Sequence, residues 1–320
     1  MLLEVLIVND LWVKYYTMSG VVEAVSGVSF RLREKEMLAI VGESGSGKST
    51  LGFSILNMVP KPGKIVNGQI LLEGTDILKL HPHEIRKIRG SKISMVFQDP
   101  FTTLDPLRKI VDQFGEFLVE HGVEKSKVNT IVKEYLEAVG LPERIMYSYP
   151  HQLSGGQKQR VSIAMAIALN PQIVVADEPT TALDVVVQKQ IMDLIDVIKE
   201  KYGTSIILIT HDLALALERA NSVMVMYGGY IMEYADKTEL YNNMKHPYTK
   251  ALFEALPRVK YKTLPKSLPG NPPDLRRPPP GCIFHPRCEF ATEKCRIEKP
   301  LLREVSKNHL VACHYAGEIQ

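Results

Sequence analysis

Cysteine is missing from the first 281 residues, and the whole chain of 320 residues contains only four. All four lie between Cys282 and Cys313, which leaves the preceding core with none. This clustering favours a local metal or cluster site over a scattered disulfide framework.

Long apolar runs are missing too, since none approaches the ~20 residues that a helix needs to span a bilayer. The opening segment, Met1 to Asp10, contains Glu4 and has no cationic start before a long apolar stretch, so it does not resemble a signal peptide. If the protein serves a membrane process, we expect it to act from the cytoplasmic side through a partner.

A strong net charge is also missing, because the formal charge is only +3. That value is too small to indicate nucleic-acid binding by itself. The charge is uneven, at −3 over residues 1–235 and +6 over residues 236–320. The basic tail either contacts an anionic surface or is simply solvated. With 45% hydrophobic residues, the chain has ample material for a buried core.

The order of apolar segments predicts an α/β fold. Short strands are expected at residues 3–8, 22–30 and 38–41, and again at 173–176 and 205–210, with helical stretches such as 188–201 between the later ones. Alternating strands and helices indicate a parallel sheet covered on both faces. Between roughly Pro106 and Tyr149 the apolar spacing is helical, which predicts a helical insertion.

A phosphate-binding loop follows the most apolar strand. Gly42, Gly47, Lys48 and Ser49 match the pattern in which backbone N–H groups close around phosphate oxygens, Lys48 reaches the β- and γ-phosphates and Ser49 binds Mg²⁺. The alternative is an ordinary glycine-rich turn. The order of strand, loop and helix favours the nucleotide site.

Two further segments fit phosphoryl transfer. An apolar strand ends in Asp177 and Glu178, of which the first can hold Mg²⁺ through water and the second can polarise the attacking water. Alone, such acids could equally be a helix cap or a surface feature. The segment Leu153–Gln157 fits a capping box, but a helix N-terminus preceded by two adjacent glycines is also a second phosphate receptor.

Together these motifs resemble the ABC transporter ATPases over residues 1 to about 235. The resemblance implies a P-loop NTPase core with an antiparallel β subdomain and a helical subdomain at about 100–155. It also implies a head-to-tail dimer that sandwiches ATP between one phosphate loop and the partner's signature sequence. It assigns catalysis to Glu178, His211 and Gln98. It assigns Mg²⁺ to Ser49, Gln98 and Asp177. It assigns nucleotide contacts to Tyr15, Gly42, Ser44, Gly45, Gly47, Lys48, Ser49, Thr50, Gln98, Ser154, Gly155, Gly156, Gln157, Asp177 and Asp184.

Some of these roles have plain alternatives. Gln98 and Asp184 could be turn residues, and His211 could be a structural histidine at a strand end. Tyr15 occupies the place of the aromatic that stacks on adenine, but the adjacent Tyr16 could take that role, and either could be a packing aromatic.

The composition changes from about Asp236, after which 11 of the 20 prolines occur. Residues 246–257 and 281–288 resemble the C-terminal region of dipeptide and oligopeptide importer ATPases. The resemblance implies a C-terminal extension at 236–320 that holds a [4Fe-4S] cluster through Cys282, Cys288, Cys295 and Cys313.

The cysteine spacing, Cys-x5-Cys-x6-Cys-x17-Cys, lacks the close pairs usual in zinc knuckles, which favours iron and sulfur over zinc. Zinc and two disulfides remain alternatives. His285 and His314 either join the ligands or decorate the loops. A metal that only staples a small tail is favoured over redox chemistry.

The leading interpretation is therefore an ATP-hydrolysing subunit of a peptide importer. Its expected partners are a second ATPase subunit in a heterodimer, two transmembrane permease subunits and an extracytoplasmic solute-binding protein, at the cytoplasmic face of the membrane. Related importers carry oligosaccharides or nickel, so the cargo stays open. A nucleic-acid maintenance ATPase is the other alternative, but only 106 positions separate Lys48 from Ser154, without sustained heptads, and no nucleic acid is expected as a partner.

Overall fold

The computed structural model describes residues 3–256 and 268–318. The chain forms two compact units. The first unit combines Met1–Lys79 with Leu208–Gln320, and the second unit is Leu80–Ile207.

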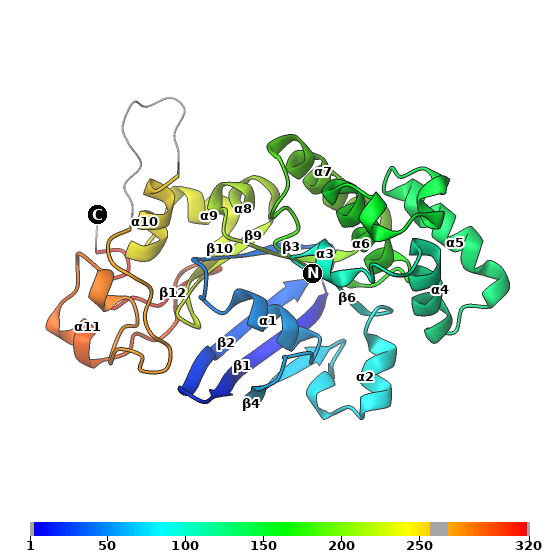
Figure 1. Cartoon of the computed structure of the whole chain (residues 1–320). Coiled ribbons are helices and arrows are strands. Elements are labelled where there is room, and N and C mark those ends of the chain that lie inside the picture. The colour runs from blue at the N-terminus through cyan, green and yellow to red at the C-terminus, as the bar shows by residue number, and fades with distance from the viewer. Residues whose placement is uncertain (1–2, 257–267, 319–320) are drawn as a thin grey trace. The chain divides into compact units, whose positions relative to one another are not determined.

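An antiparallel sheet forms the first part of the first unit (Figure 1). Its strands run in the order β2-β1-β4-β5. Their bounds are Glu4–Thr17 (β1), Gly20–Arg33 (β2), Gly63–Leu72 (β4) and Thr75–Asp76 (β5). Side chains on β2 alternate near its end, with Val28, Phe30 and Leu32 buried, because successive strand residues point to opposite faces. This is the antiparallel β subdomain that the resemblance implies.

A second group of strands in the first unit supports the phosphate loop. Strand β3 (Met37–Val41) is buried at all five positions and pairs in parallel with β9 (Ser222–Tyr227), as expected for strands covered on both faces. β9 continues antiparallel into β10 (Tyr230–Asp236). The helices of this unit are α1 (Lys48–Ile55), α8 (Leu213–Arg219), α9 (Lys237–Asn242), α10 (Pro247–Glu254) and α11 (Glu293–Ile297), with short 3-10 turns at Ile77–Lys79 and His285–Arg287.

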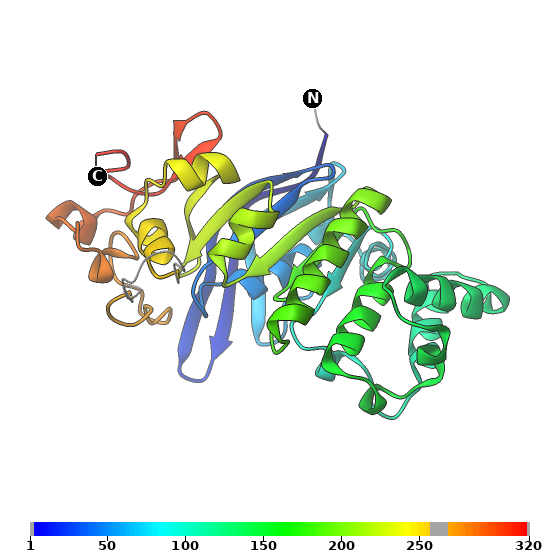
Figure 2. The ribbon, with the colours of Figure 1, turned by 90° about the horizontal axis from the view of Figure 1, so that it is seen from above.

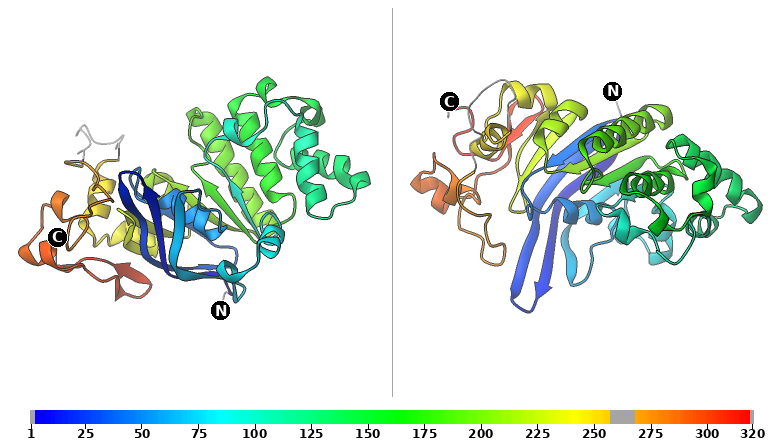
Figure 3. Two further views of the ribbon diagram at one scale, coloured as in Figure 1. Left: turned by 60° about the horizontal axis from the view of Figure 1, so that its bottom comes forward. Right: turned by 45° about the horizontal axis from the view of Figure 1, so that its top comes forward.

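The C-terminal extension adds two strands to this sheet. β12 (His309–Val311) pairs antiparallel with β10, and β11 (Arg303–Ser306) pairs with β12. In Figure 3 the orange and red end of the chain lies beside the yellow α9–α10 segment. The sequence suggests a separate appendage, but these pairings place the described part of it in the first unit with residues 1–79. The boundary at residue 235 remains a prediction.

The second unit is mainly helical around two parallel strands. β6 (Ile93–Val96) pairs with β7 (Ile173–Asp177), and every residue of both is buried. Its elements also include α2 (Pro82–Ile88), α3 (Pro100–Thr103), α4 (Ile110–Glu120), α5 (Lys125–Ala138), α6 (Gly155–Ile167) and α7 (Val185–Tyr202), with 3-10 turns at Glu143–Tyr147 and Pro150–Gln152. The remaining strand, β8 (Ser205–Thr210), crosses the boundary between the units.

The helices of the second unit follow one another from cyan to green in Figure 2. All the elements described between Pro100 and Ile167 are helices or 3-10 turns. This stretch contains residues 106–149, where the helical spacing of apolar residues predicts a helical insertion. In α5, Val132, Tyr135 and Leu136 face the interior, as a 3.6-residue period requires. Within the described residues, no helix is both long and apolar enough to cross a membrane.

Candidate functional site

The phosphate loop, residues 42–50, is shaped by glycines. It leaves β3 and enters α1 through Gly47, whose φ of 99° is rarely adopted by other residues. A Cβ at Gly47 would lie 2.2 Å from the carbonyl oxygen of Ala24, so the close backbone approach also requires glycine. Because α1 begins at Lys48, the N–H groups of its first turn and its positive dipole end lie at the loop.

Lys48 is buried within this loop, with 5% of its surface exposed. Its Nζ donates to the carbonyl oxygens of Gly42 at 2.7 Å and Glu43 at 2.9 Å. Ser49 and Thr50 follow in the first turn of α1 and are half-buried, whereas Ser44 and Gly45 are exposed. The ammonium is thus held at the loop by its own backbone, a position from which it can reach a phosphate.

Tyr15 and Tyr16 differ in their surroundings. They are adjacent on β1 and point to opposite faces. The Tyr15 hydroxyl lies 3.3 Å from Thr50 Oγ1 in α1, so its ring is tied to the end of the phosphate loop. Tyr16 is 48% exposed, and Lys64 Nζ lies 5.8 Å from its ring centre. The geometry favours Tyr15 as the adenine contact, and that role remains a prediction.

In the second unit, Gln98 and Glu178 are brought together. Gln98 Nε2 donates to Glu178 Oε2 at 3.0 Å, and Thr181 Oγ1 donates to the same oxygen at 2.9 Å. Glu178 follows Asp177, the buried last residue of β7, and has a φ of 43°, which non-glycine residues rarely adopt. Such strain is frequent at functional sites. Two donors therefore fix the carboxylate that the sequence predicts to position water.

The signature segment, Leu153–Gln157, forms the capping box. Ser154 Oγ accepts the N–H of Gln157 at 3.3 Å, and Gln157 Oε1 accepts the N–H of Ser154 at 3.0 Å. One detail of the expectation is wrong: the glycines do not precede the helix but are its first two residues, because Ser154 is the cap. Gly155 and Gly156 thus lie in the first turn, whose N–H groups lack intrahelical acceptors.

Asp184 and His211 lie next to helix starts. Asp184 is the N-cap of α7, and its Oδ1 accepts the N–H groups of Val186 at 3.1 Å and Val187 at 3.0 Å. His211 follows β8 and is exposed, just before Asp212, the N-cap of α8. The capping role of Asp184 is compatible with the predicted dimer contact.

The predicted nucleotide residues are divided between the two units. Tyr15, the phosphate loop and His211 belong to the first unit. Gln98, the pair Asp177 and Glu178, the signature segment and Asp184 belong to the second unit. Each half of the candidate site is therefore defined by contacts within its own unit.

The four cysteines belong to the first unit, where two of them are buried and two are half-buried. Burial, with a smaller contribution from the charges of the other cysteines, raises the pKa of Cys282 to about 12 and that of Cys288 to about 11. The pKa of Cys313 is raised for the same reasons. The Cys282 N–H donates to the carbonyl of Cys295 at 2.8 Å, which ties two of them together. All four are free thiols.

A metal-ion geometry is not formed by these groups. Across residues 3–256 and 268–318, no three or more His, Cys, Asp or Glu side chains are arranged to hold a metal ion. His285 Nδ1 contacts the carbonyl of Cys282 at 2.9 Å, and His314 Nε2 contacts that of Glu298 at 2.9 Å. Each histidine thus has a backbone partner at one ring nitrogen, which is compatible with either role.

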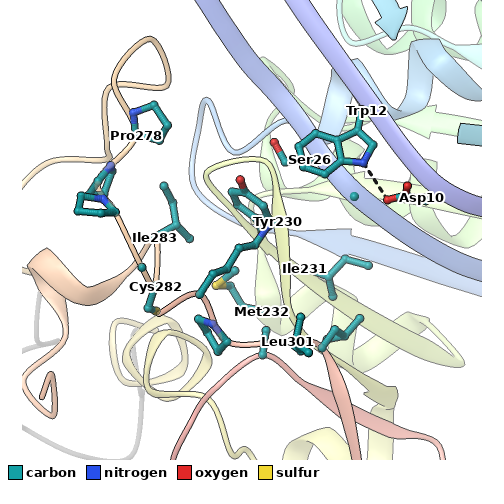
Figure 4. Close-up of a pocket in the computed structure, with 18 residues that line it drawn as sticks. Asp10, Trp12, Ser26, Tyr230, Ile231, Met232, Pro278, Cys282, Ile283 and Leu301 are labelled. Carbon is teal, nitrogen blue, oxygen red and sulfur yellow. Dashed lines mark hydrogen bonds between the residues drawn. The ribbon is translucent and has the colours of Figure 1, made fainter. Parts of the chain in front are cut away.

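A pocket of about 490 Å³ lies beside the cysteine region (Figure 4). Its wall includes Cys282, Tyr230 and Trp12, whose Nε1 donates to Asp10 Oδ1 at 2.8 Å. Lys299 Nζ lies 3.7 Å from the Tyr230 ring centre, a cation–π contact. None of the predicted nucleotide residues lines it, so this pocket is distinct from the phosphate loop.

One ion pair at the phosphate loop is not indicated by any sequence motif. Arg287, from the extension, donates to both carboxylate oxygens of Glu43 at 2.6 and 3.0 Å. The sequence feature that points to this pair is Glu43 itself. A carboxylate inside a loop that binds phosphate is favoured when a cation lies nearby.

The fold and these motifs define the class of ABC-type ATPases. The ABC transporter family model matches residues 25–181, and the model for the C-terminal region of oligopeptide/dipeptide transporters matches residues 232–295. The chain belongs to the ATP-hydrolysing subunits of the oligopeptide/dipeptide ABC transporter family.

Individual relatives agree along nearly the whole chain. It is 43% identical over 315 residues to the oligopeptide transport ATP-binding protein OppD of Haemophilus influenzae, which covers 97% of each chain. It is 41% identical over 315 residues to the dipeptide transport ATP-binding protein DppD of Caldanaerobacter subterraneus, again covering 97% of each. Among solved structures, the dimeric ATP-binding cassette MJ0796 bound to ADP and Pi has a TM-score of 0.64 at 30% identity and covers 72% of this chain and 98% of its own.

Proposed function

We propose that this chain couples ATP hydrolysis to the import of dipeptides or oligopeptides. The observation that carries the hydrolysis step is the fixed carboxylate of Glu178, held by Gln98 and Thr181 at the end of a buried strand. Peptide import is supported by the match of residues 232–295 and by relatives whose names state oligopeptide or dipeptide transport. Oligosaccharide or nickel import and nucleic-acid maintenance are the alternatives.

In this proposal the phosphate loop binds the ATP phosphates through its N–H groups and Lys48. Ser49, Asp177 and Gln98 would hold Mg²⁺, which would supply positive charge to the phosphates during transfer. Glu178 accepts a hydrogen bond from the attacking water and aligns it with the γ-phosphorus, while His211 contacts the γ-phosphate. Tyr15 stacks on adenine. The resulting reaction is an in-line displacement that yields ADP and phosphate.

The proposed assembly supplies what a single chain lacks. The N–H groups at the start of α6, in the signature segment, contact the γ-phosphate of the ATP held by a partner ATPase, and Asp184 lies at the seam. We propose a heterodimer at the cytoplasmic face, with two permease subunits that contact the groove near Gln98 and an extracytoplasmic solute-binding protein. The isolated chain should then be a poor enzyme.

The cysteine group is proposed to hold a [4Fe-4S] cluster, with zinc as the alternative. The donor type fits, because cysteine thiolates are the ligands of both groups and neighbouring cysteines contribute to the raised pKa of Cys282 and Cys288. A cubane cluster holds its sulfur ligands farther apart than a single tetrahedral ion does, so the two require different thiol spacing. The group's proposed role is to stabilise the extension.

The absorption spectrum of anaerobically purified chain tests this assignment. A cluster gives a broad visible absorption that Cys282→Ser removes, whereas zinc gives none. A chain with stoichiometric zinc and no iron would reject the cluster.

The substitution Glu178→Gln tests hydrolysis in the assembled transporter. We expect ATP binding to be retained and turnover to fall roughly 10²- to 10⁴-fold, because the amide cannot accept the water proton. Glu200→Gln, at an exposed position on the same unit, is the matched control. Unchanged turnover in Glu178→Gln would reject the assigned role, and uptake of labelled peptide against oligosaccharide or nickel identifies the cargo.

A further inference from the structure

A carboxylate lies inside the phosphate loop. Glu43 is the second residue of the loop, and its backbone carbonyl accepts a hydrogen bond from Lys48 Nζ at 2.9 Å. An unpaired negative side chain in this loop would weaken the binding of the negative ATP phosphates, because like charges at short range repel. The position therefore needs a counter-ion.

Arg287 provides that counter-ion from a distant part of the sequence. Its guanidinium forms a two-pronged pair with Glu43, at 2.6 Å from Nη1 to Oε2 and 3.0 Å from Nη2 to Oε1. The Arg287 side chain is only 5% exposed, and that of Glu43 is 26% exposed, so water screens the pair weakly. Such bidentate pairs fix orientation as well as charge.

Further contacts lock the guanidinium in place. Arg287 Nε donates to the carbonyl of Pro269 at 2.7 Å, and Nη1 also donates to the Tyr227 hydroxyl at 3.2 Å. The Tyr227 ring packs against Phe284 with ring centres 5.2 Å apart, and Phe284 lies three residues before Arg287. The extension thus presents Arg287 in one orientation.

A second residue from the same extension holds the Glu43 backbone. The Glu43 N–H donates to the hydroxyl of Tyr248 at 3.0 Å, and Tyr248 is fully buried against Tyr227 with ring centres 4.6 Å apart. Side chain and backbone of Glu43 are therefore both fixed by the region after residue 235. Since Lys48 rests on the Gly42 and Glu43 carbonyls, displacing Glu43 also displaces the lysine ammonium.

We propose that Arg287 is a positioning residue for ATP binding: it neutralises Glu43 in the phosphate loop, so that the C-terminal extension sets the ATP affinity of the core. The inference rests on the proposed assignment of residues 42–50 to ATP. It acts through Glu43, and Arg287 itself does not touch the nucleotide.

A double-substitution cycle on the full chain tests the proposal by calorimetric titration with Mg-ATP. Arg287→Gln should weaken binding at least about 10-fold, because it leaves Glu43 charged and unpaired. Glu43→Gln should weaken binding clearly less than Arg287→Gln does, because it removes the repelling charge, and the double variant Arg287→Gln/Glu43→Gln should recover at least about 3-fold of the affinity that Arg287→Gln loses. The deficit of Arg287→Gln should shrink at high salt, as a charge effect must.

Controls separate this effect from loss of structure. Arg276→Gln removes an exposed arginine paired with Asp274 and should leave affinity unchanged. In the assembled transporter, Arg287→Gln should raise KM for ATP with kcat changed less than about 3-fold, the pattern of lost binding. If Arg287→Gln does not fold, Arg287→Lys and the double variant carry the comparison.

Two results would overturn the inference. Parent-like affinity in Arg287→Gln would show that the loop needs no counter-ion. Equal weakening in Arg287→Gln and the double variant would show a purely structural contact. Lys48→Ala reports separately on the proposed ATP site, because parent-like binding in that variant would place ATP elsewhere whatever Arg287 does.

Discussion

The nucleotide core and the C-terminal extension are organised by different kinds of interaction. In the core, most of the predicted residues lie at a strand end or a helix start, such as Lys48 at the start of α1 and Ser154 before α6. In the extension, the decisive contacts join residues far apart in sequence, such as Arg287 with Glu43. Function in the core can therefore be inferred from local backbone chemistry, whereas function in the extension depends on long-range pairs.

A second set of long-range contacts in the extension surrounds the buried carboxylate of Glu233. Glu233 on β10 is fully buried and accepts the N–H groups of Lys245 at 2.7 Å and His246 at 3.1 Å. It also pairs with His309 Nε2 of β12 at 2.7 Å, while His309 Nδ1 lies 3.3 Å from Glu239. These contacts connect three segments of the extension to the edge of the sheet, and removing one partner of such a buried pair is costly.

The largest expected effect tests the local side of this comparison. Gly47→Ala should weaken ATP binding by at least about 100-fold, because its Cβ would meet the Ala24 carbonyl oxygen at 2.2 Å and the residue keeps a positive φ. Calorimetric titration of the full chain measures it. The matched control is Gly45→Ala, which has a φ of 78° in the same loop but open space around a Cβ. A loss in Gly45→Ala as large as in Gly47→Ala would contradict the role of the close backbone approach.

Most of the core could be predicted from sequence, because its signals are short-range. Glycines with positive φ, Ser154 three residues before Gln157, and two acids at the end of β7 each specify their own backbone. The pairing of Gln98 with Glu178 joins residues 80 positions apart, and only the resemblance placed both at the nucleotide. The predicted start of α6 is wrong by two residues, because the sequence does not reveal whether the two glycines after Ser154 precede the helix or form its first turn.

The extension could be predicted only in outline. Proline content marked where the composition changes, and cysteine spacing marked a thiol group. Neither pattern reveals that β12 pairs with β10 or that Arg287 reaches the phosphate loop, since charge pairs carry no spacing rule across 244 positions. Tertiary packing decides such contacts.

The second prediction tests the long-range side through pH. Burial lowers the pKa of His309, but hydrogen bonds and charges from Glu233 and Glu239 outweigh it, so the pKa is raised. A raised pKa means that the folded state holds the proton more tightly than the unfolded state. The stabilisation is therefore complete below the unfolded value of about 6.5 and is lost as pH rises through the folded value.

Thermal unfolding at pH 6 and pH 9 measures this effect. The fall in Tm across that interval should be several degrees larger in the parent than in His309→Gln, which has no proton to lose. His246 acts in the opposite direction, because burial lowers its pKa to about 4 against the charge of Glu233, so its contribution is lost as pH falls from about 6.5. His151→Gln, at an exposed position of the second unit, is the control. Equal pH slopes in parent and His309→Gln would contradict the assigned pair.

The smallest expected effect concerns the adenine contact, for which the local sequence pattern leaves both Tyr15 and Tyr16 as candidates. Tyr15→Ala should weaken ATP binding about 5-fold, the size of one lost aromatic stack of roughly 1 kcal/mol. Tyr15→Phe should keep the affinity within about 2-fold, because stacking needs the ring and not the hydroxyl that contacts Thr50. Tyr16→Ala is the matched control and should change affinity less than about 2-fold, since its 48% exposed ring lies on the other face of β1. If Tyr16→Ala weakens binding more than Tyr15→Ala, the adenine contact belongs to Tyr16, and strand alternation has been assigned to the wrong face.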